Sequence, residues 1–143
     1  MSLVTPLNLD RLPLGRRLRL SLEVLLTYLR VRLVMRDDDA ERAVSHLRST
    51  FKGPPMAFEP GLELLVAWRL ARAVITILER LPSDSRCLVR SLTLICMLER
   101  RGIPESLVIA VRPDPFAAHA WVEVANQAML PAADPGYERL LEL

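Results

Sequence analysis

Two residues of the sequence have the chemistry of a nucleophile and of its base, Cys87 and His119. Cys87 falls within the first turn of an expected helix whose N-cap is one of residues 83–85. At a helix start, unpaired backbone N–H groups and the helix dipole favour an anion, so the thiolate form of a cysteine is favoured there. Arg86 and Arg90 add positive charge nearby. The position of Cys87 therefore predicts a reactive thiol.

The second cysteine, Cys96, has a different environment in the same expected helix. It is flanked by Leu94, Ile95 and Met97, which is typical of the middle of a buried helix. Nine steps of about 100° place the two cysteines on opposite faces of that helix. We therefore expect Cys96 to be an inert core residue and expect no disulfide between the two thiols.

His119 lies in a segment with the two-residue period of a strand, which places His119, Trp121 and Glu123 on one face. A helix start that packs across an antiparallel sheet can bring a thiol within about 3–4 Å of such an imidazole. The imidazole then takes the thiol proton and later returns it to a leaving amine, and N–H groups at the helix start form part of an oxyanion hole. Taken alone, a histidine in such a strand is more often a structural residue with satisfied hydrogen bonds than a catalytic one.

The elements that must position this pair follow from hydrophobic periodicity. Helices are expected over residues 16–35, 40–49, 60–81 and from the cap at 83–85 to 101, where Gly102 is a stop signal. Strands are expected over residues 107–112, 118–124, 128–130 and 137–141. Helices first and a small antiparallel sheet afterwards predict an α+β fold.

A chain of 143 residues suits one compact domain. We divide it into a helical region, 1–81, for core support and for docking of substrate or partner, and a catalytic region, 82–143. The first helix carries an apolar stripe that is expected to pack mostly inside, with reception of a partner protein as the alternative. The stripe consists of Leu18, Leu22, Leu25, Leu26, Leu29 and Leu33.

Composition narrows the classes of partner and cofactor. Nineteen basic and seventeen acidic residues give a net charge of +2, which argues against nucleic acid as a main partner. Seven arginines over residues 11–36 are compatible with a solvated face, an acidic peptide or a membrane surface. No signal peptide and no long apolar run is visible, so we expect a cytoplasmic protein without stable membrane insertion. Two histidines and two cysteines lack zinc spacing, and no glycine-rich phosphate loop occurs, so no metal or cofactor is expected.

Residues 87–124 carry several motifs in a fixed order. Cys-Leu-Val-Arg-Ser-Leu-Thr-Leu spans 87–94, Arg-Gly-Ile-Pro spans 101–104, and His-Ala-Trp-Val-Glu spans 119–123. This combination resembles the transglutaminase-like leader peptidases of lasso-peptide biosynthesis, a family of microcin-processing cysteine peptidases. The N-terminal helices are similar to that family in general character.

The resemblance implies a papain-like, transglutaminase-type fold and a cysteine peptidase with catalytic Cys87 and His119. Such an enzyme cuts a ribosomally made precursor between its leader and its core, through a thioester on the cysteine. In the family, a small, separately encoded recognition protein commonly presents the leader, and an ATP-using lasso cyclase then closes the ring. The precursor and the recognition protein are therefore the implied partners.

One position departs from the family pattern. The family usually has an acidic residue about twelve positions after the histidine, and this chain has Pro131 there. Either Asp134 orients the imidazole instead, or the site is a Cys–His dyad oriented by a backbone carbonyl or an amide. Glu123 is about 13 Å along the strand from the histidine, so a solvated or edge carboxylate is expected there.

Three further residues are candidates for substrate contact: Arg112, Phe116 and Trp121. Arg112 and Phe116 belong to the connector between two expected strands, which either lines the cleft or only joins the strands. Trp121 either shields the Cys–His pair from water or is plain core. The sequence also leaves two other functions open, an acyl transferase that uses the same thioester and a non-catalytic peptide-binding module.

Overall fold

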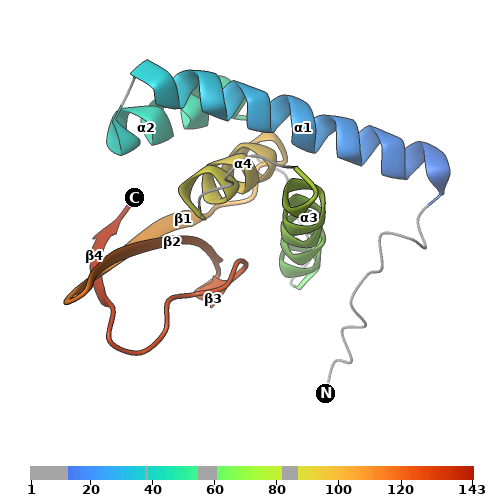
Figure 1. Cartoon of the computed structure of the whole chain (residues 1–143). Helices are drawn as coiled ribbons and strands as arrows, with labels where there is room; N and C mark the ends of the chain where they lie inside the picture. The colour runs from blue at the N-terminus through green and yellow to red at the C-terminus, as the bar shows by residue number, and fades with distance from the viewer. Residues whose placement is uncertain (1–12, 38, 55–60, 82–86) are drawn as a thin grey trace.

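The computed structural model describes residues 13–37, 39–54, 61–81 and 87–143, and within these ranges four helices precede four strands (Figure 1). The helices are α1 (Leu14–Asp37), α2 (Ala40–Phe51), α3 (Leu62–Glu79) and α4 (Cys87–Arg100). The strands are β1 (Ser106–Pro113), β2 (Phe116–Val124), β3 (Gln127–Ala128) and β4 (Glu138–Glu142). The predicted α+β fold is confirmed. Within the described ranges, no helix is both long and apolar enough to cross a bilayer.

The strands form one antiparallel sheet in the order β3-β2-β1-β4. Its centre is the β1–β2 hairpin, whose register runs from Ser106 opposite Glu123 to Pro113 opposite Phe116. Ala125 and Asn126 have positive φ angles of 49° and 62°, the conformation that a two-residue hairpin turn requires. This turn leads into the short β3, so β2 has a long neighbour on one side and a very short one on the other.

Helix α4 is the central element of the molecule. In Figure 1 it lies between α1 and the sheet, and every residue from Ser91 to Leu98 is buried. One hydrophobic cluster joins this helix to residues of α1, α2, α3 and the sheet. The start of α4 packs towards β2, while Arg101, directly after the end of α4, donates two hydrogen bonds to Glu23 of α1 at 2.8 and 2.9 Å.

The helix ends follow the capping signals of the sequence. Asp39 caps α2 by accepting a hydrogen bond from the Arg42 amide at 2.9 Å. After α4, Gly102 adopts a φ of 70°, and its amide donates to the Glu99 carbonyl while the Ile103 amide donates to Leu98, each at 3.0 Å. This is the Schellman motif, and it confirms the predicted stop. The expected N-cap of α4 at residues 83–85 lies outside the described residues.

The expectation that the apolar stripe of α1 packs mostly inside is wrong. Val24, Thr27, Tyr28 and Val31 form the buried face. The exposed side carries six leucines that are each 55–69% exposed, and we call them the leucine face: Leu14, Leu18, Leu22, Leu26, Leu29 and Leu33. The reason is that α1 is apolar on two sides. Its valines and Tyr28, rather than the larger leucine stripe, pack on the rest of the protein.

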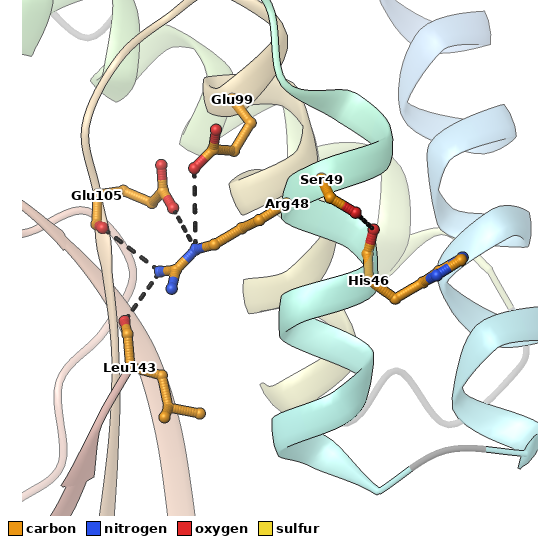
Figure 2. A network of polar contacts seen from close by, with 6 residues as sticks. All are labelled: His46, Arg48, Ser49, Glu99, Glu105 and Leu143. Carbon is orange, nitrogen blue, oxygen red and sulfur yellow. Dashed lines mark hydrogen bonds and ion pairs between the residues drawn. The ribbon is translucent and has the colours of Figure 1, made fainter.

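A polar network holds the end of the sheet against the helices (Figure 2). Arg48 of α2 donates to the Glu105 carboxylate at 2.9 Å and to the Leu143 backbone oxygen at 2.8 Å, and Glu99 lies 3.8 Å away. The Glu105 side chain is 1% exposed. Burial, together with the neighbouring Glu99 carboxylate, raises the pKa of Glu105 to about 8. No local pattern in the sequence predicts this network.

Candidate active site

The thiol of Cys87 lies at the start of α4 and directly against strand β2. Cys87 is the first residue of the helix and is half-buried. Its Sγ accepts a hydrogen bond from the backbone amide of Ala120 at 3.4 Å. Because that amide belongs to the peptide group that follows His119, the thiol adjoins the histidine's own backbone. The helix start and the histidine strand are therefore brought together.

The Ala120 amide is available to the sulfur because β3 is short. The Val122 carbonyl accepts a hydrogen bond from the Met129 amide at 2.8 Å, so the polar groups of Val122 point towards β3. In a strand, the amide two residues earlier points to the same side, which places the Ala120 N–H there as well. The β3 ladder pairs only with Glu123 and Val124 and ends before it reaches Ala120. An N–H group aimed at sulfur stabilises negative charge on it.

The imidazole of His119 is held by a backbone carbonyl. Its Nε2 lies 2.7 Å from the oxygen of Pro131. A carbonyl only accepts hydrogen bonds, so Nε2 must carry the hydrogen. In the neutral ring, Nδ1 is then the nitrogen with the free lone pair. The contact therefore selects the tautomer in which Nδ1 is the nitrogen that can accept a proton.

This contact occurs at the sequence position where the leader peptidases that the chain resembles usually have an acidic residue. Pro131 has no polar side chain, but its carbonyl oxygen accepts the hydrogen bond that a carboxylate would accept. Asp134 is exposed, and no hydrogen bond joins it to His119, both being described residues. Of the two ways of orienting the ring that the sequence left open, the structure contains the backbone carbonyl.

Trp121 forms a wall beside the histidine. Its ring stacks on that of His119 with centroids 5.9 Å apart and planes 28° apart, and the residue is 4% exposed. Its Nε1 donates to Glu123 at 2.9 Å, and Arg139 of β4 pairs with the same carboxylate at 2.9 Å. The expectation of a solvated Glu123 is wrong, because its side chain is 11% exposed and bonded on two sides. Arg139 is a supporting residue that carries no local signal in the sequence.

Arg112 and Phe116, the two candidates for substrate contact near the β1–β2 connection, lie on opposite faces of the sheet. Ala110 of β1 pairs with His119, so Arg112, two residues along, shares the histidine face. The Arg112 guanidinium lies 5.2 Å from the Tyr137 ring centroid, and its Nε donates to the Pro115 carbonyl at 3.2 Å. Phe116 is three residues from His119, so it points to the opposite face, where it is 76% exposed.

The other cysteine, Cys96, is an unreactive residue of the core. Cys96 is 0% exposed, and burial raises the pKa of its thiol to about 12. A thiol with that pKa in the core is neutral near pH 7 and out of reach of reagents. This agrees with the expected inert role and leaves Cys87 as the accessible thiol of the described residues. In this part of the chain, no cluster of three His, Cys, Asp or Glu residues is placed to hold a metal ion.

A sequence profile of the transglutaminase-like superfamily matches residues 23–142. The chain belongs to the transglutaminase-like superfamily. The match starts inside α1 and ends in β4, so it covers the N-terminal helices as well as the segment that carries Cys87 and His119. No curated protein and no solved structure matches the chain significantly.

Membership in the transglutaminase-like superfamily indicates which chemistry the placement of Cys87 and His119 suits. Proteins of the transglutaminase-like superfamily are often cysteine hydrolases or transferases. In this transglutaminase-like chain, Cys87 begins the central helix and His119 lies on the strand beside it. The arrangement is suited to acyl chemistry, in which a sulfur attacks a carbonyl and a histidine moves the proton.

Proposed function

We propose that this protein is a cysteine peptidase that removes the leader from a ribosomally made lasso-peptide precursor. The single observation that carries the proposal is the contact of the Cys87 sulfur with the peptide group between His119 and Ala120. The motifs over 87–124, which resemble those of the lasso leader peptidases, supply the substrate class. Superfamily membership supports the cysteine-dependent reaction type.

In the proposed reaction, Nδ1 of His119 takes the proton of the Cys87 thiol, because Nε2 is engaged with Pro131. The thiolate attacks the carbonyl carbon of the scissile bond, and N–H groups at the start of α4 stabilise the resulting oxyanion. The imidazolium then gives its proton to the departing amine of the core peptide, and the leader remains as a thioester on sulfur. Water, deprotonated by the same imidazole, attacks the thioester and releases the leader acid and the free thiol.

The proposal includes three partners. The precursor binds through its leader, a small separately encoded recognition protein presents it, and a lasso cyclase uses the freed amine of the core. A transferase would share every step up to the thioester and differ only in the acceptor, an amine in place of water. The products therefore decide between hydrolysis and transfer.

The deciding experiment incubates the protein with the precursor and the recognition protein encoded beside it, followed by mass spectrometry of the peptides. Hydrolysis gives leader and core whose summed mass exceeds that of the precursor by one water. Transfer gives a leader joined to an added amine, and a binding module leaves the precursor intact. Cys87→Ala and His119→Ala are expected to abolish cleavage. Cys96→Ala is the matched control and is expected to remain active, because Cys96 is buried away from the site.

A further inference from the structure

The leucine face of α1 is a large apolar surface with nothing packed on it among the described residues. Its six members are each more than half exposed, and they run over 19 helical steps, about 28 Å. A soluble protein rarely exposes a contiguous apolar patch of this kind unless the patch binds something. The opposite side of the same helix is already packed on the domain, so rotation of α1 would only exchange one exposed apolar face for another.

Part of the leucine face borders a groove. The groove has a volume of about 560 Å³ and lies where α1 meets the end of α2 and the end of α4. Its apolar lining includes Leu26, Leu29 and Leu33 from α1 and Phe51 from α2, and its rim includes Arg30 and Arg100. A concave apolar channel beside an exposed helix is the shape that receives a second amphipathic helix.

The charges around this surface are mostly positive. At 100° per residue, Arg19 and Arg30 flank one edge of the leucine face and Arg32 lies at the other. Arg36 continues the face itself beyond Leu33, and the exposed Asp37 lies on the edge of Arg19. Glu23, the acidic residue on the groove lining, is 15% exposed and is neutralised by Arg100 at 3.5 Å and Arg101 at 2.8 Å. A matching occupant therefore carries acidic residues on both sides of its apolar stripe.

Two other occupants fit less well. In a two-fold contact between copies of this chain, each leucine face would bring its flanking arginines against the same arginines, and such like-charge contacts are unfavourable. A bilayer surface would cover the convex leucines of α1 but has no protruding side chains to fill the groove in front of Phe51. An acidic amphipathic helix satisfies both the groove and the charges.

The position of the surface leaves the catalytic pair free. The leucine face lies near the C-terminal end of α4, where Arg100 and the following Arg101 contact Glu23, whereas Cys87 begins the same helix. The two ends of α4 are separated by 13 helical steps, about 20 Å. A protein docked on α1 could hold a bound peptide within reach of Cys87 without covering the thiol.

We propose that the leucine face and its groove bind an acidic amphipathic helix of the protein that presents the precursor. The chemistry of the occupant follows from the surface, whereas its identity as the presenting protein rests on the proposed function. Leu26, Leu29 and Leu33 lie on both the leucine face and the groove, and Arg30 lines the groove at the edge of that face. These residues are expected to contribute most.

The test measures the affinity of the full-length chain for the recognition protein encoded beside it, by fluorescence anisotropy at low and high salt. The double variant Leu26→Ala/Leu29→Ala is expected to weaken binding at least about tenfold, and Arg30→Glu to weaken it and reduce its salt dependence. Leu140→Ala is the matched control, because Leu140 is 67% exposed on β4, which pairs with β1 in the sheet. All three proteins are expected to keep the wild-type rate of Cys87 alkylation, which shows that the fold and the site are intact.

Unchanged affinity in the double variant, or no binding by the wild type, would overturn the proposal. It would also be overturned if the leucine face instead mediated binding to phosphatidylglycerol vesicles, or self-association in analytical ultracentrifugation. Binding does not require cleavage, so the two proposals fail separately. Loss of binding in the double variant without any cleavage by the wild type removes only the peptidase function, and cleavage with unchanged affinity removes only the docking surface.

Discussion

Nε2 of His119 lies 2.7 Å from the carbonyl oxygen of Pro131, and this hydrogen bond fixes the ring without a carboxylate. A carbonyl oxygen accepts a hydrogen bond as a carboxylate does, but it has no full negative charge to stabilise an imidazolium. The carbonyl therefore keeps the orientation and the tautomer of the His119 ring, but it stabilises a positively charged ring less than a carboxylate would. The backbone thus positions the His119 ring on one side, and the Trp121 ring packs against it on another.

The first prediction concerns Asp134. Asp134→Ala is expected to cleave precursor within about twofold of the wild-type rate, because the ring bonds to Pro131 and the carboxylate is exposed. His119→Ala, measured in parallel, shows the loss that removal of the base produces. If Asp134→Ala lost activity about a hundredfold, the carboxylate would have to reach the imidazole during the reaction.

The second prediction concerns the hydrogen bond between Trp121 and Glu123. Trp121→Phe keeps an aromatic ring against His119 but removes the N–H that Glu123 accepts at 2.9 Å. We expect kcat to fall about three- to tenfold with little change in KM, since the imidazole is positioned less firmly. Steady-state kinetics on the precursor measure both constants. A rise in KM at constant kcat would instead show that Trp121 binds substrate directly.

Local patterns of the sequence predicted the elements that hold Cys87 and His119. The strand period placed His119 and Trp121 on one face, and Gly102 marked the end of α4, because both signals depend on neighbouring residues only. The Pro131 contact could not be identified from residue types, because every residue has a backbone carbonyl. Periodicity also could not tell which apolar side of α1 packs inside, since that choice depends on how α1 packs against the other helices of the assembled fold.

The Arg48–Glu105 pair is a second feature of the fold that the sequence could not predict. The two residues are 57 positions apart, and only the assembled fold brings them together. In the sequence, both look like ordinary charged surface residues. The result is a carboxyl whose pKa is raised to about 8, which has a consequence for stability.

The third prediction is the pH dependence of that stability. Glu105 has an ordinary pKa of 4.5 in the unfolded chain and about 8 in the fold, because burial and Glu99 disfavour its charge. Between these values the folded state keeps a proton that the unfolded state has lost, so the free energy of unfolding falls as pH rises, by at most about 1.4 kcal/mol per pH unit. Below pH 4.5 and above pH 8 this contribution is flat.

Urea denaturation at several pH values measures this slope in the wild type and in Glu105→Gln. The variant has no titrating group at this position, so its slope between pH 5 and 8 is expected to be shallower. Equal slopes in the two proteins would show that Glu105 is ionised throughout, held by Arg48 at 2.9 Å.

The fourth prediction concerns Gly53, which follows α2 and lies against the end of α4. Its amide donates to the Glu99 carbonyl at 2.9 Å, and a Cβ built on it would lie 2.1 Å from the Arg100 carbonyl oxygen. Since that obstacle is backbone, Gly53→Ala is expected to cost about 2–4 kcal/mol of unfolding free energy. Thermal unfolding followed by circular dichroism measures the loss.

Gly15 is the matched control for this substitution. It lies in α1, and a Cβ added to it would have no neighbouring atom within 4 Å, so Gly15→Ala is expected to leave stability unchanged or raise it by up to about 1 kcal/mol. A Gly53→Ala protein as stable as Gly15→Ala would mean that the segment after α2 shifts away from α4 at little cost.

Whether His119 activates Cys87 is decided by the rate at which iodoacetamide alkylates each cysteine near neutral pH, read by peptide mass spectrometry in the wild type and in His119→Ala. If the imidazole activates the thiol, the wild type is labelled rapidly at Cys87 and not at the buried Cys96, and His119→Ala slows Cys87 labelling at least about tenfold. Equal, slow labelling of both cysteines, or a Cys87 rate that is unchanged without the imidazole, would show that the two residues do not form a catalytic dyad.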